Sequence, residues 1–286
     1  MRCTSSIAGA GCFHGSRPEC WASLLVGLDR HVVQGGQRTG QELAITAHTD
    51  SQGHDEHDQA DGRQQPRVLL FDVNETLSDL SPLAQRFTEV GAPPHLAATW
   101  FASLLRDGFA LTATGANPSF AELGAEALRG RLAGQVGDVD AAVERIMSEF
   151  SKLPVHPDVV EGVHNLHSLG ISLVTLSNGS TAVAQGLFDR NDLGGYFDSL
   201  LSVEQAPLWK PAEAAYSFAL EACGCEASDA MLVAVHPWDI DGAHKAGLAT
   251  AWINRTDARY PAYFAAPDIE ATSLVDLGAQ LGGVAA

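Results

Sequence analysis

The pattern of apolar and polar positions divides the chain into two unlike parts, with the change near residue 67. Residues 1–66 are rich in Gly, Ser, Gln, His and Asp, and residues 51–65 are polar throughout. Such a segment cannot bury enough apolar surface to offset the entropy lost on ordering. We therefore expect residues 1–66 to be a disordered N-terminal extension, or one that a misplaced start codon has added. A solvated linker also explains its potential metal ligands, which are His54, Asp55, His57 and Asp58.

An apolar run opens the second part. Residues 67–71 read Arg-Val-Leu-Leu-Phe and end at Asp72, which is typical of a strand buried on both faces of a sheet. In residues 81–150 the apolar residues recur at helical spacing, as at Leu96 and Trp100, with little strand pattern. This stretch predicts a helical cap that is inserted after the first strand.

Beyond residue 154 the pattern alternates between helical and strand periods. Helices are expected near 157–169, 181–189, 211–223 and 240–246, and strands at 171–176, 199–202, 231–235 and 249–253. Strands that alternate with helices predict an α/β fold with a doubly wound parallel sheet, right-handed crossovers and helices on both faces. The α/β core is assigned to residues 67–80 plus 155–286, and the cap to residues 81–154.

Composition and charge restrict what the protein binds. Hydrophobic residues make up 45% of the 286 residues and charged residues 18%, which indicates a globular chain with a sizeable core. The formal net charge of −18 argues against nucleic acid and membrane as partners, because both require clustered Lys and Arg. The five cysteines do not form the pattern of a disulfide framework. No apolar run reaches the roughly 18 residues of a membrane span, so a cytoplasmic location is expected.

Polar residues follow the ends of several predicted strands. The candidates at these positions are Asp72, Thr76, Ser177, Asn178, Lys210, His236 and Asp239. Because ligands bind at the carboxyl edge of open α/β sheets, these side chains are expected to meet in one crevice. A carboxylate such as Asp72 is ionised at pH 7, and it can act as a nucleophile when it is desolvated, oriented and close to a cation. Lys210 is the expected cation.

Four motifs carry a resemblance to a known family. They are Asp72-x-x-x-Thr76, Ser177-Asn178-Gly179, Lys210-Pro211 and Trp238-Asp239-x-x-Gly242-Ala243. In this order the motifs resemble those of the haloacid dehalogenase superfamily, and within it the type II 2-haloacid dehalogenase branch. The resemblance covers roughly residues 67–265 and implies a Rossmann-like core with a helical cap.

The resemblance implies a role for each matching residue. Asp72 is implied to be the nucleophile that forms an aspartyl ester, and Thr76 to orient it. Lys210 is implied to stabilise the ester intermediate, while Asp239 pairs with Lys210 and helps to position the hydrolytic water. The positions assigned to substrate binding are Asn74, Phe101, Ser177, Asn178, Tyr216 and His236.

Two residues favour dehalogenation over the hydrolysis of phosphate esters. A phosphatase of this superfamily needs an acid two residues after the nucleophile to protonate the leaving alcohol, and that position is Asn74. It also needs Mg²⁺ with oxygen ligands, but the position that supplies a further Asp is Ala234. The sequence therefore predicts a hydrolase without metal or other cofactor that attacks C2 of a small 2-haloalkanoic acid and releases halide.

The match to the dehalogenases is incomplete. Phe101 stands where the familiar dehalogenases carry an arginine for halide and carboxylate, and Arg106 would replace that arginine only if its helix were rotated. His236 can bind an anion as the cation, or activate water as the neutral imidazole. Two alternatives remain open: a Mg²⁺-dependent small-molecule phosphatase and an inactive protein that binds a metabolite. The expected partner is a small-molecule carboxylate substrate, and the resemblance also allows a homodimer.

Overall fold

The structure, a computed structural model, describes residues 65–284 of the chain. The expected N-terminal extension lies outside the described residues apart from its last two positions, and so do the candidate metal ligands within it. In the described part, six parallel strands form one sheet in the order β3-β2-β1-β4-β5-β6. The strands are β1 (Val68–Phe71), β2 (Ser172–Ser177), β3 (Ser199–Ser202), β4 (Ala230–Ala234), β5 (Ala249–Ile253) and β6 (Ile269–Ala271).

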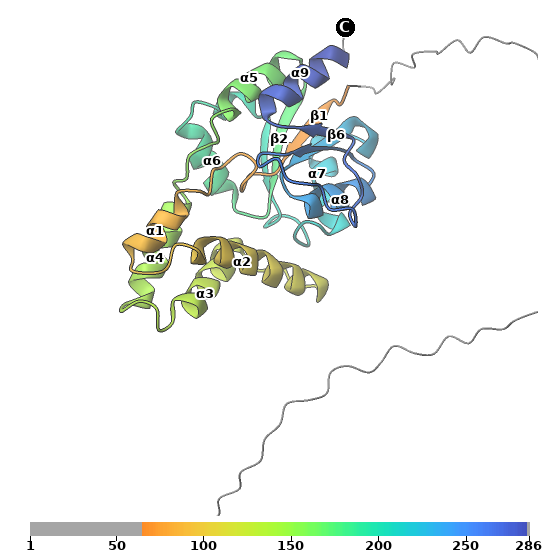
Figure 1. Cartoon of the computed structure of the whole chain (residues 1–286). Helices are drawn as coiled ribbons and strands as arrows, with labels where there is room; N and C mark the ends of the chain where they lie inside the picture. The colour runs from red at the N-terminus through yellow and green to blue at the C-terminus, as the bar shows by residue number, and fades with distance from the viewer. Residues whose placement is uncertain (1–64, 285–286) are drawn as a thin grey trace, which may run out of the picture. The chain divides into compact units, whose positions relative to one another are not determined.

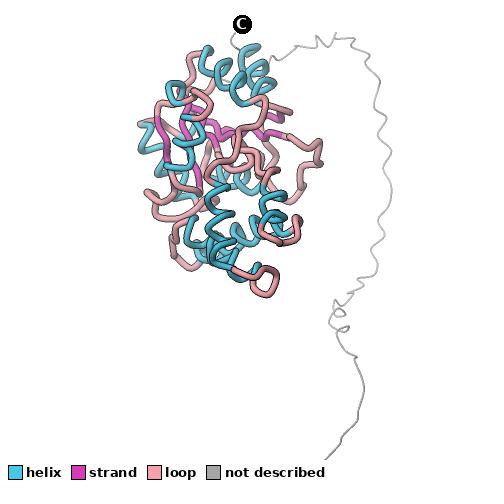
Figure 2. The backbone as a smooth tube through the Cα atoms, turned by 90° about the vertical axis from the view of Figure 1, so that its left-hand side faces the viewer, coloured by secondary structure: helices cyan, strands magenta, loops and turns pink. Residues whose placement is uncertain are grey.

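Helices cover both faces of the sheet, because successive strand residues point to opposite sides. One face is covered by α5 (Val159–Ser168), α6 (Thr181–Asp189) and α9 (Leu274–Val284), and the other by α7 (Glu213–Cys223) and α8 (Pro237–Lys245). Two short 3₁₀ helices, η1 (Gly194–Tyr196) and η2 (Ala227–Asp229), precede β3 and β4. Figure 2 shows the strands enclosed between helices. The predicted doubly wound α/β fold is therefore confirmed.

A helical insertion follows β1, as the sequence predicted. Its helices are α1 (Leu83–Glu89), α2 (Leu96–Ala113), α3 (Phe120–Leu132) and α4 (Val139–Phe150). Helix α2 packs on α3 and α3 packs on α4, while α1 packs on both α2 and α4 (Figure 1). Trp100 lies at their centre with no exposed surface, and its indole N–H donates to the Gly124 carbonyl at 2.9 Å. The insertion thus has an apolar interior of its own, which continues into the core.

Aromatic side chains and one asparagine join the cap to the core. Trp209, in the segment between β3 and α7, stacks on Phe120 of α3 with ring centroids 5.8 Å apart. Its indole N–H donates to the Pro118 carbonyl at 2.9 Å. The side-chain amide of Asn117 donates to the Val203 and Ala206 carbonyls at 3.0 and 2.8 Å. These contacts hold the loop before α3 against the core.

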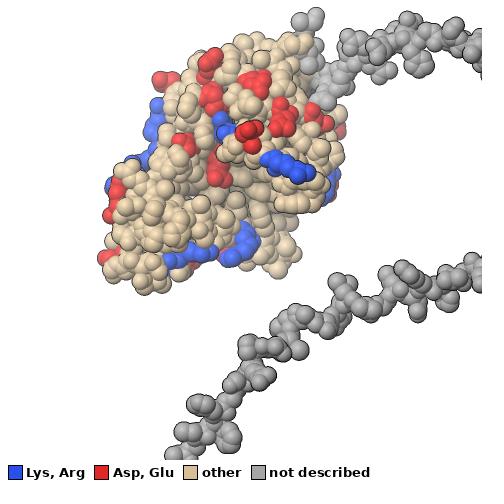
Figure 3. Space-filling model, in the orientation of Figure 1, with Lys and Arg blue, Asp and Glu red and all other residues tan. Residues whose placement is uncertain are grey.

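Most predicted elements occur within a few residues of their expected places, but the C-terminal end was not predicted. Helix α8 begins at Pro237, three residues before the helix expected near 240–246. The edge strand β6 and helix α9 have no counterpart in the prediction. Among the described residues, no helix combines the length and apolar character that crossing a membrane requires. On the face drawn in Figure 3, basic side chains form separate small groups, while acidic ones spread over the core.

Candidate active site

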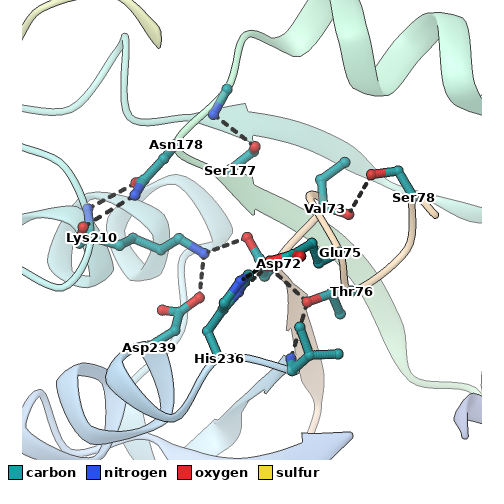
Figure 4. Close-up of polar contacts among 12 residues, drawn as sticks. Asp72, Val73, Glu75, Thr76, Ser78, Ser177, Asn178, Lys210, His236 and Asp239 are labelled. Carbon is teal, nitrogen blue, oxygen red and sulfur yellow. Dashed lines mark hydrogen bonds and ion pairs between the residues drawn. The ribbon is translucent and has the colours of Figure 1, made fainter. Parts of the chain in front are cut away.

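The predicted strand-end residues meet at the carboxyl edge of the sheet. Phe71 of β1 pairs with Thr175 of β2 and with Val233 of β4, so the three central strands end within two residues of one another. The Asp72 amide donates to the Val233 carbonyl at 3.0 Å, which fixes the first residue beyond β1. Figure 4 shows the side chains of this edge converging from loops that lie far apart in the sequence.

Lys210 connects two carboxylates inside the protein. Its ammonium donates to Asp72 Oδ1 at 3.1 Å and to Asp239 Oδ2 at 2.5 Å, and its side chain has no exposed surface (Figure 4). Burial lowers the pKa of Lys210, but the charges of Asp239 and Asp72 outweigh burial and raise it above its usual value. Burial raises the pKa of Asp72, but Lys210, His236 and Thr76 outweigh burial and hold it well below its usual value. Asp72 is therefore ionised at neutral pH.

The second oxygen of Asp72 has different partners. Thr76 Oγ1 donates to Asp72 Oδ2 at 2.7 Å and accepts the Val235 amide proton at 3.1 Å. Because Oγ1 accepts the amide proton of Val235 on one side, its own hydroxyl hydrogen is directed at Asp72. This contact restricts the orientation of the carboxylate.

His236 links Asp72 to Glu75, a residue that the sequence analysis did not single out. Its Nδ1 lies 3.2 Å from Asp72 Oδ2 and its Nε2 lies 2.8 Å from Glu75 Oε2. Burial lowers the pKa of His236, but the hydrogen bonds and charges of Asp72 and Glu75 outweigh burial and raise the pKa to about 9. The ring is therefore an imidazolium at neutral pH and donates to both carboxylates.

The loop that carries Asp72 and Glu75 is held from outside. Glu75 has a φ of 63°, in the left-handed region that residues with a side chain seldom adopt. Its carbonyl bonds His156 Nε2 at 2.9 Å, while the Arg255 guanidinium donates to the Thr76 carbonyl at 2.8 Å and to Asp158 Oδ1 at 2.6 Å. The left-handed conformation of Glu75, and the long-range contacts to the Glu75 and Thr76 carbonyls, can be recognised only in the structure.

Asn178 and Tyr216, both assigned to substrate binding, contact the charged residues instead. The side-chain amide of Asn178 donates to the Lys210 carbonyl at 3.2 Å and accepts the Lys210 amide proton at 3.0 Å. Tyr216 is fully buried, and its hydroxyl donates to Asp239 Oδ1 at 2.7 Å. Burial and the nearby Asp239 raise the pKa of Tyr216 well above its usual value, so the phenol stays protonated. Both side chains are used to hold Lys210 and Asp239 in place.

Two further predicted positions lie close to this network. Ser177 is buried, and its hydroxyl accepts the Gly179 amide proton at 2.9 Å. Asn74 is also buried, and it approaches so near to Gly179 that a methyl group there would lie 3.3 Å from its side-chain nitrogen. The loops after β1 and β2 therefore touch at these residues.

A cavity of about 780 Å³ opens between the cap and the carboxyl edge of the sheet. His236 and Glu75 line it, together with Phe101 from the cap, whereas Asp72 lies behind them and does not line it. Most of the remaining wall is apolar, with Leu80, Leu83, Ala97, Ala98, Pro237 and Trp252 among its residues. A ligand in this cavity would approach Asp72 past the imidazolium of His236.

Arg106 does not replace the missing cap arginine. Its side chain is 68% exposed and forms an ion pair with Asp107 at 2.8 Å. It lines a separate shallow hollow on the cap rather than the cavity beside His236. The idea that a rotated helix would bring Arg106 to the site is therefore wrong.

The residues at the carboxyl edge do not suit a divalent cation. The Lys210 ammonium already lies between Asp72 and Asp239, which are the two carboxylates that would have to bind the ion. Asn74 and Ala234 occupy the two positions at which a phosphatase of this kind needs further acidic groups. Within residues 65–284, no cluster of three or more His, Cys, Asp or Glu side chains has the arrangement of a metal site.

Comparisons with known proteins point to one family. Residues 66–247 match the family model described as haloacid dehalogenase-like hydrolase. The chain is similar to (S)-2-haloacid dehalogenase 4A of Burkholderia cepacia, with 31% identity over 204 residues, which are 70% of this chain and 88% of the relative. It is also similar to the (S)-2-haloacid dehalogenase of Pseudomonas sp. strain YL, with 29% identity over 72% of this chain and 90% of the relative.

Solved structures agree in fold. The crystal structure of an L-2-haloacid dehalogenase covers 78% of this chain and 100% of its own, with a TM-score of 0.72 and 28% identity. The L-2-haloacid dehalogenase from Xanthobacter autotrophicus has a TM-score of 0.70 over 76% of this chain and 99% of its own. Its identity is 22%, so this second likeness shows the fold alone.

Proposed function

The chain belongs to the family of haloacid dehalogenase-like hydrolases, and from this premise we propose that it is a metal-independent 2-haloacid dehalogenase. The proposed substrate is a small 2-haloalkanoic acid. The observation that carries the proposal is the buried Asp72 carboxylate, held ionised by Lys210 and aimed by Thr76. A desolvated and oriented carboxylate of this kind is a competent nucleophile.

In the first half of the proposed reaction, an oxygen of Asp72 attacks C2 of the haloacid. The carbon–halogen bond breaks, halide leaves with the electron pair, and an ester links Asp72 to C2. Halide needs no proton, so the lack of an acid at Asn74 is no obstacle. The substrate carboxylate would lie near the His236 imidazolium, a cation on the cavity wall. Phe101 would contact the apolar part of the substrate.

In the second half, water attacks the ester at the carbonyl carbon of Asp72. The products are the 2-hydroxy acid and the free carboxylate. We propose that Asp239 and Tyr216 act through Lys210, since both Asp239 oxygens are already bonded to Lys210 and Tyr216. Asn178 would hold the backbone of Lys210 in the same way.

Halide release from 2-chloropropionate tests the proposal. The wild-type protein is expected to release halide in the presence of a metal chelator, and Asp72→Asn to lose at least about 10³-fold in turnover. Mass spectrometry of protein quenched during turnover should show a substrate adduct on Asp72. Asp140→Asn is the control, because Asp140 lies on the exposed side of α4. Equal halide release by Asp72→Asn would reject the nucleophile, and Mg²⁺-dependent release of phosphate from p-nitrophenyl phosphate would favour the phosphatase alternative.

A further inference from the structure

The contact of His236 with both Asp72 and Glu75 points to a role in the second half of the reaction. We infer that His236, held by Glu75, is the general base that takes a proton from the water that hydrolyses the Asp72 ester. The inference rests on the proposed ester mechanism. It gives His236 a direct role on the reacting atoms, and it gives Glu75 a role that acts through His236.

The two oxygens of Asp72 are not equivalent. Oδ2 accepts from Thr76 at 2.7 Å and lies 3.2 Å from His236 Nδ1, whereas Oδ1 accepts from Lys210 alone at 3.1 Å. Oδ1 therefore has more free lone-pair density and is the oxygen that attacks. Esterification at Oδ1 leaves Oδ2 as the carbonyl oxygen, still held by Thr76. His236 Nδ1 then lies beside the carbonyl group that water must attack.

Formation of the ester changes the charge around His236. In the resting protein the ring lies between two carboxylates, and only 12% of its side chain is exposed. The ester is neutral, so one of the two anions that stabilise the imidazolium is lost. Nδ1 can then release its proton to water in the cavity, while Glu75 keeps Nε2 protonated at 2.8 Å. The lone pair on Nδ1 is then free to accept a proton from a water molecule beside the ester.

Other charged groups near the ring do not compete for this role. Asp79, His95, His156, Arg255 and Arg259 line the same cavity. In the described part of the chain, none of them forms a hydrogen bond or ion pair with His236, whose polar partners are Asp72 and Glu75. Lys210 reaches the ring only through Asp72. The protonation of His236 is therefore governed by the two carboxylates that it contacts.

Asp239 is a poorer base for the water. Its side chain has no exposed surface, and both of its oxygens are bonded, to Lys210 at 2.5 Å and to Tyr216 at 2.7 Å. His236 and Glu75 line the cavity, so water that enters the cavity reaches His236 without passing through the protein interior. A base must lie within hydrogen-bond reach of the water that it activates, and only His236 meets this condition among the described residues that contact Asp72.

The protons balance over the proposed cycle. Attack of Asp72 expels halide, and His236 then releases one proton to water. Water adds to the carbonyl carbon as its proton passes to His236 Nδ1. The tetrahedral intermediate collapses by breaking the bond between the carbonyl carbon and Oδ1, and this oxygen takes the proton from His236 and leaves as the hydroxyl of the 2-hydroxy acid. The protonated Asp72 then gives its proton to His236, which restores the resting pair of carboxylate and imidazolium.

The backbone of Glu75 supports the same assignment. Its left-handed φ of 63° is unfavourable for a residue with a side chain, and such strain is concentrated at functional sites. His156 holds the Glu75 carbonyl at 2.9 Å and so maintains this conformation. The conformation directs the carboxylate at His236 Nε2, which fixes the ring so that Nδ1 faces Asp72. Glu75 is therefore a positioning residue for the base.

A single-turnover experiment with 2-chloropropionate separates the two halves of the reaction. In His236→Asn we expect a burst of one halide per protein, followed by steady turnover at least about 10²-fold slower than in the wild type. The ester on Asp72 should accumulate and be visible by mass spectrometry. Glu75→Gln, which keeps a hydrogen-bonding side chain, should show the same burst with a smaller loss, about tenfold.

The pH dependence of ester hydrolysis provides a readout that a structural role would not affect. In the wild type the rate of the second half should fall at low pH, where His236 stays protonated in the ester. In His236→Asn this decrease should be absent. His244→Asn is the control, because His244 lies in helix α8, which begins directly after His236, but is exposed and does not line the cavity. Its burst, steady rate and pH profile should match the wild type.

The outcomes distinguish this inference from the proposed function. If the wild type forms no ester and releases no halide, the proposed function fails and the inference fails with it. If His236→Asn turns over at the wild-type rate without accumulating ester, the function stands and the inference is wrong. Loss of the burst itself in both His236→Asn and Glu75→Gln would also overturn the inference, because the pair would then act before the ester forms.

Discussion

At the scale of single residues, the most consequential feature is the complete burial of Lys210 between two carboxylates. Removing three charged groups from water costs several kcal/mol for each ion, and their mutual attraction seldom exceeds that cost by much. Such an arrangement contributes little net stability compared with well-packed apolar residues. Its value lies in holding Asp72 ionised and in one position.

Replacing Lys210 tests this view. In Lys210→Met the carboxylates of Asp72 and Asp239 remain buried without their cation, so we expect the free energy of unfolding to fall by about 3–5 kcal/mol at neutral pH. Turnover should fall by at least about 10²-fold, because the developing charge is no longer stabilised. Urea unfolding and halide release would measure the two effects.

A second substitution separates the two effects. In Lys210→Met with Asp239→Leu, only apolar side chains replace the ion pair, so stability should recover in large part while turnover stays low. Recovery of turnover together with stability would show that Lys210 acts only in folding.

The residues at the site differ in how far the sequence could identify them. Asp72, Lys210 and Asp239 were expected to meet because each follows a predicted strand end, and the structure places them in one hydrogen-bonded group. Glu75 was not expected, because its place depends on a left-handed backbone conformation. Tyr216 was expected at the substrate, whereas the structure buries it behind Asp239. Motif spacing identifies a position in a loop but not the direction of its side chain.

At the scale of helices and strands, the central elements were predictable because each is a short run with a clear apolar pattern. Strands β1 and β4 are buried along their whole length, which gives continuous apolar runs. Strand β6 has only three residues at the edge of the sheet, too few for a pattern. Helix α9 contains three glycines, which lower helix propensity, and it is stabilised by packing on α5. Strand β6 and helix α9 are therefore stabilised by tertiary contacts, which the local sequence pattern does not reveal.

The packing of the cap helix α2 on the core depends on Gly108. A methyl group at this position would lie 2.3 Å from the ring of Trp209, which is fully buried and hydrogen-bonded to Pro118. Gly108→Ala should therefore lower the free energy of unfolding by about 1–3 kcal/mol, since the ring cannot move without disturbing its neighbours.

Another glycine in the cap provides the matched control. Gly130 lies in helix α3 with no atom within 4 Å of the added methyl group. Gly130→Ala should stabilise the protein by up to about 1 kcal/mol, because alanine is the better helix former. Urea unfolding of both variants gives the comparison. Equal effects of the same sign would show that Trp209 does not restrict the approach of α2.

At the scale of the whole molecule, the cavity is a joint product of the cap and the core. Helices α1 and α2 supply one wall, and the residues that follow β4 and β5 supply the other. Its volume of about 780 Å³ falls in the range of pockets that enclose drug-sized ligands. A three-carbon haloacid would fill only a small part of it. If the proposed function holds, the protein should therefore accept 2-haloacids with longer apolar chains.

The dependence of KM on chain length tests this consequence. From 2-bromopropionate to 2-bromohexanoate, each added methylene is expected to lower KM up to about fourfold, because burial of one methylene contributes about 0.8 kcal/mol. Ala98→Trp places a large ring on the cavity wall and should abolish this gain while leaving 2-bromopropionate little affected. Ala110→Trp, at an exposed position of the same helix outside the cavity, should retain it. A KM that does not change with chain length in the wild type would mean that the apolar wall does not contact the substrate, and the longer acids would then have no advantage over the three-carbon one.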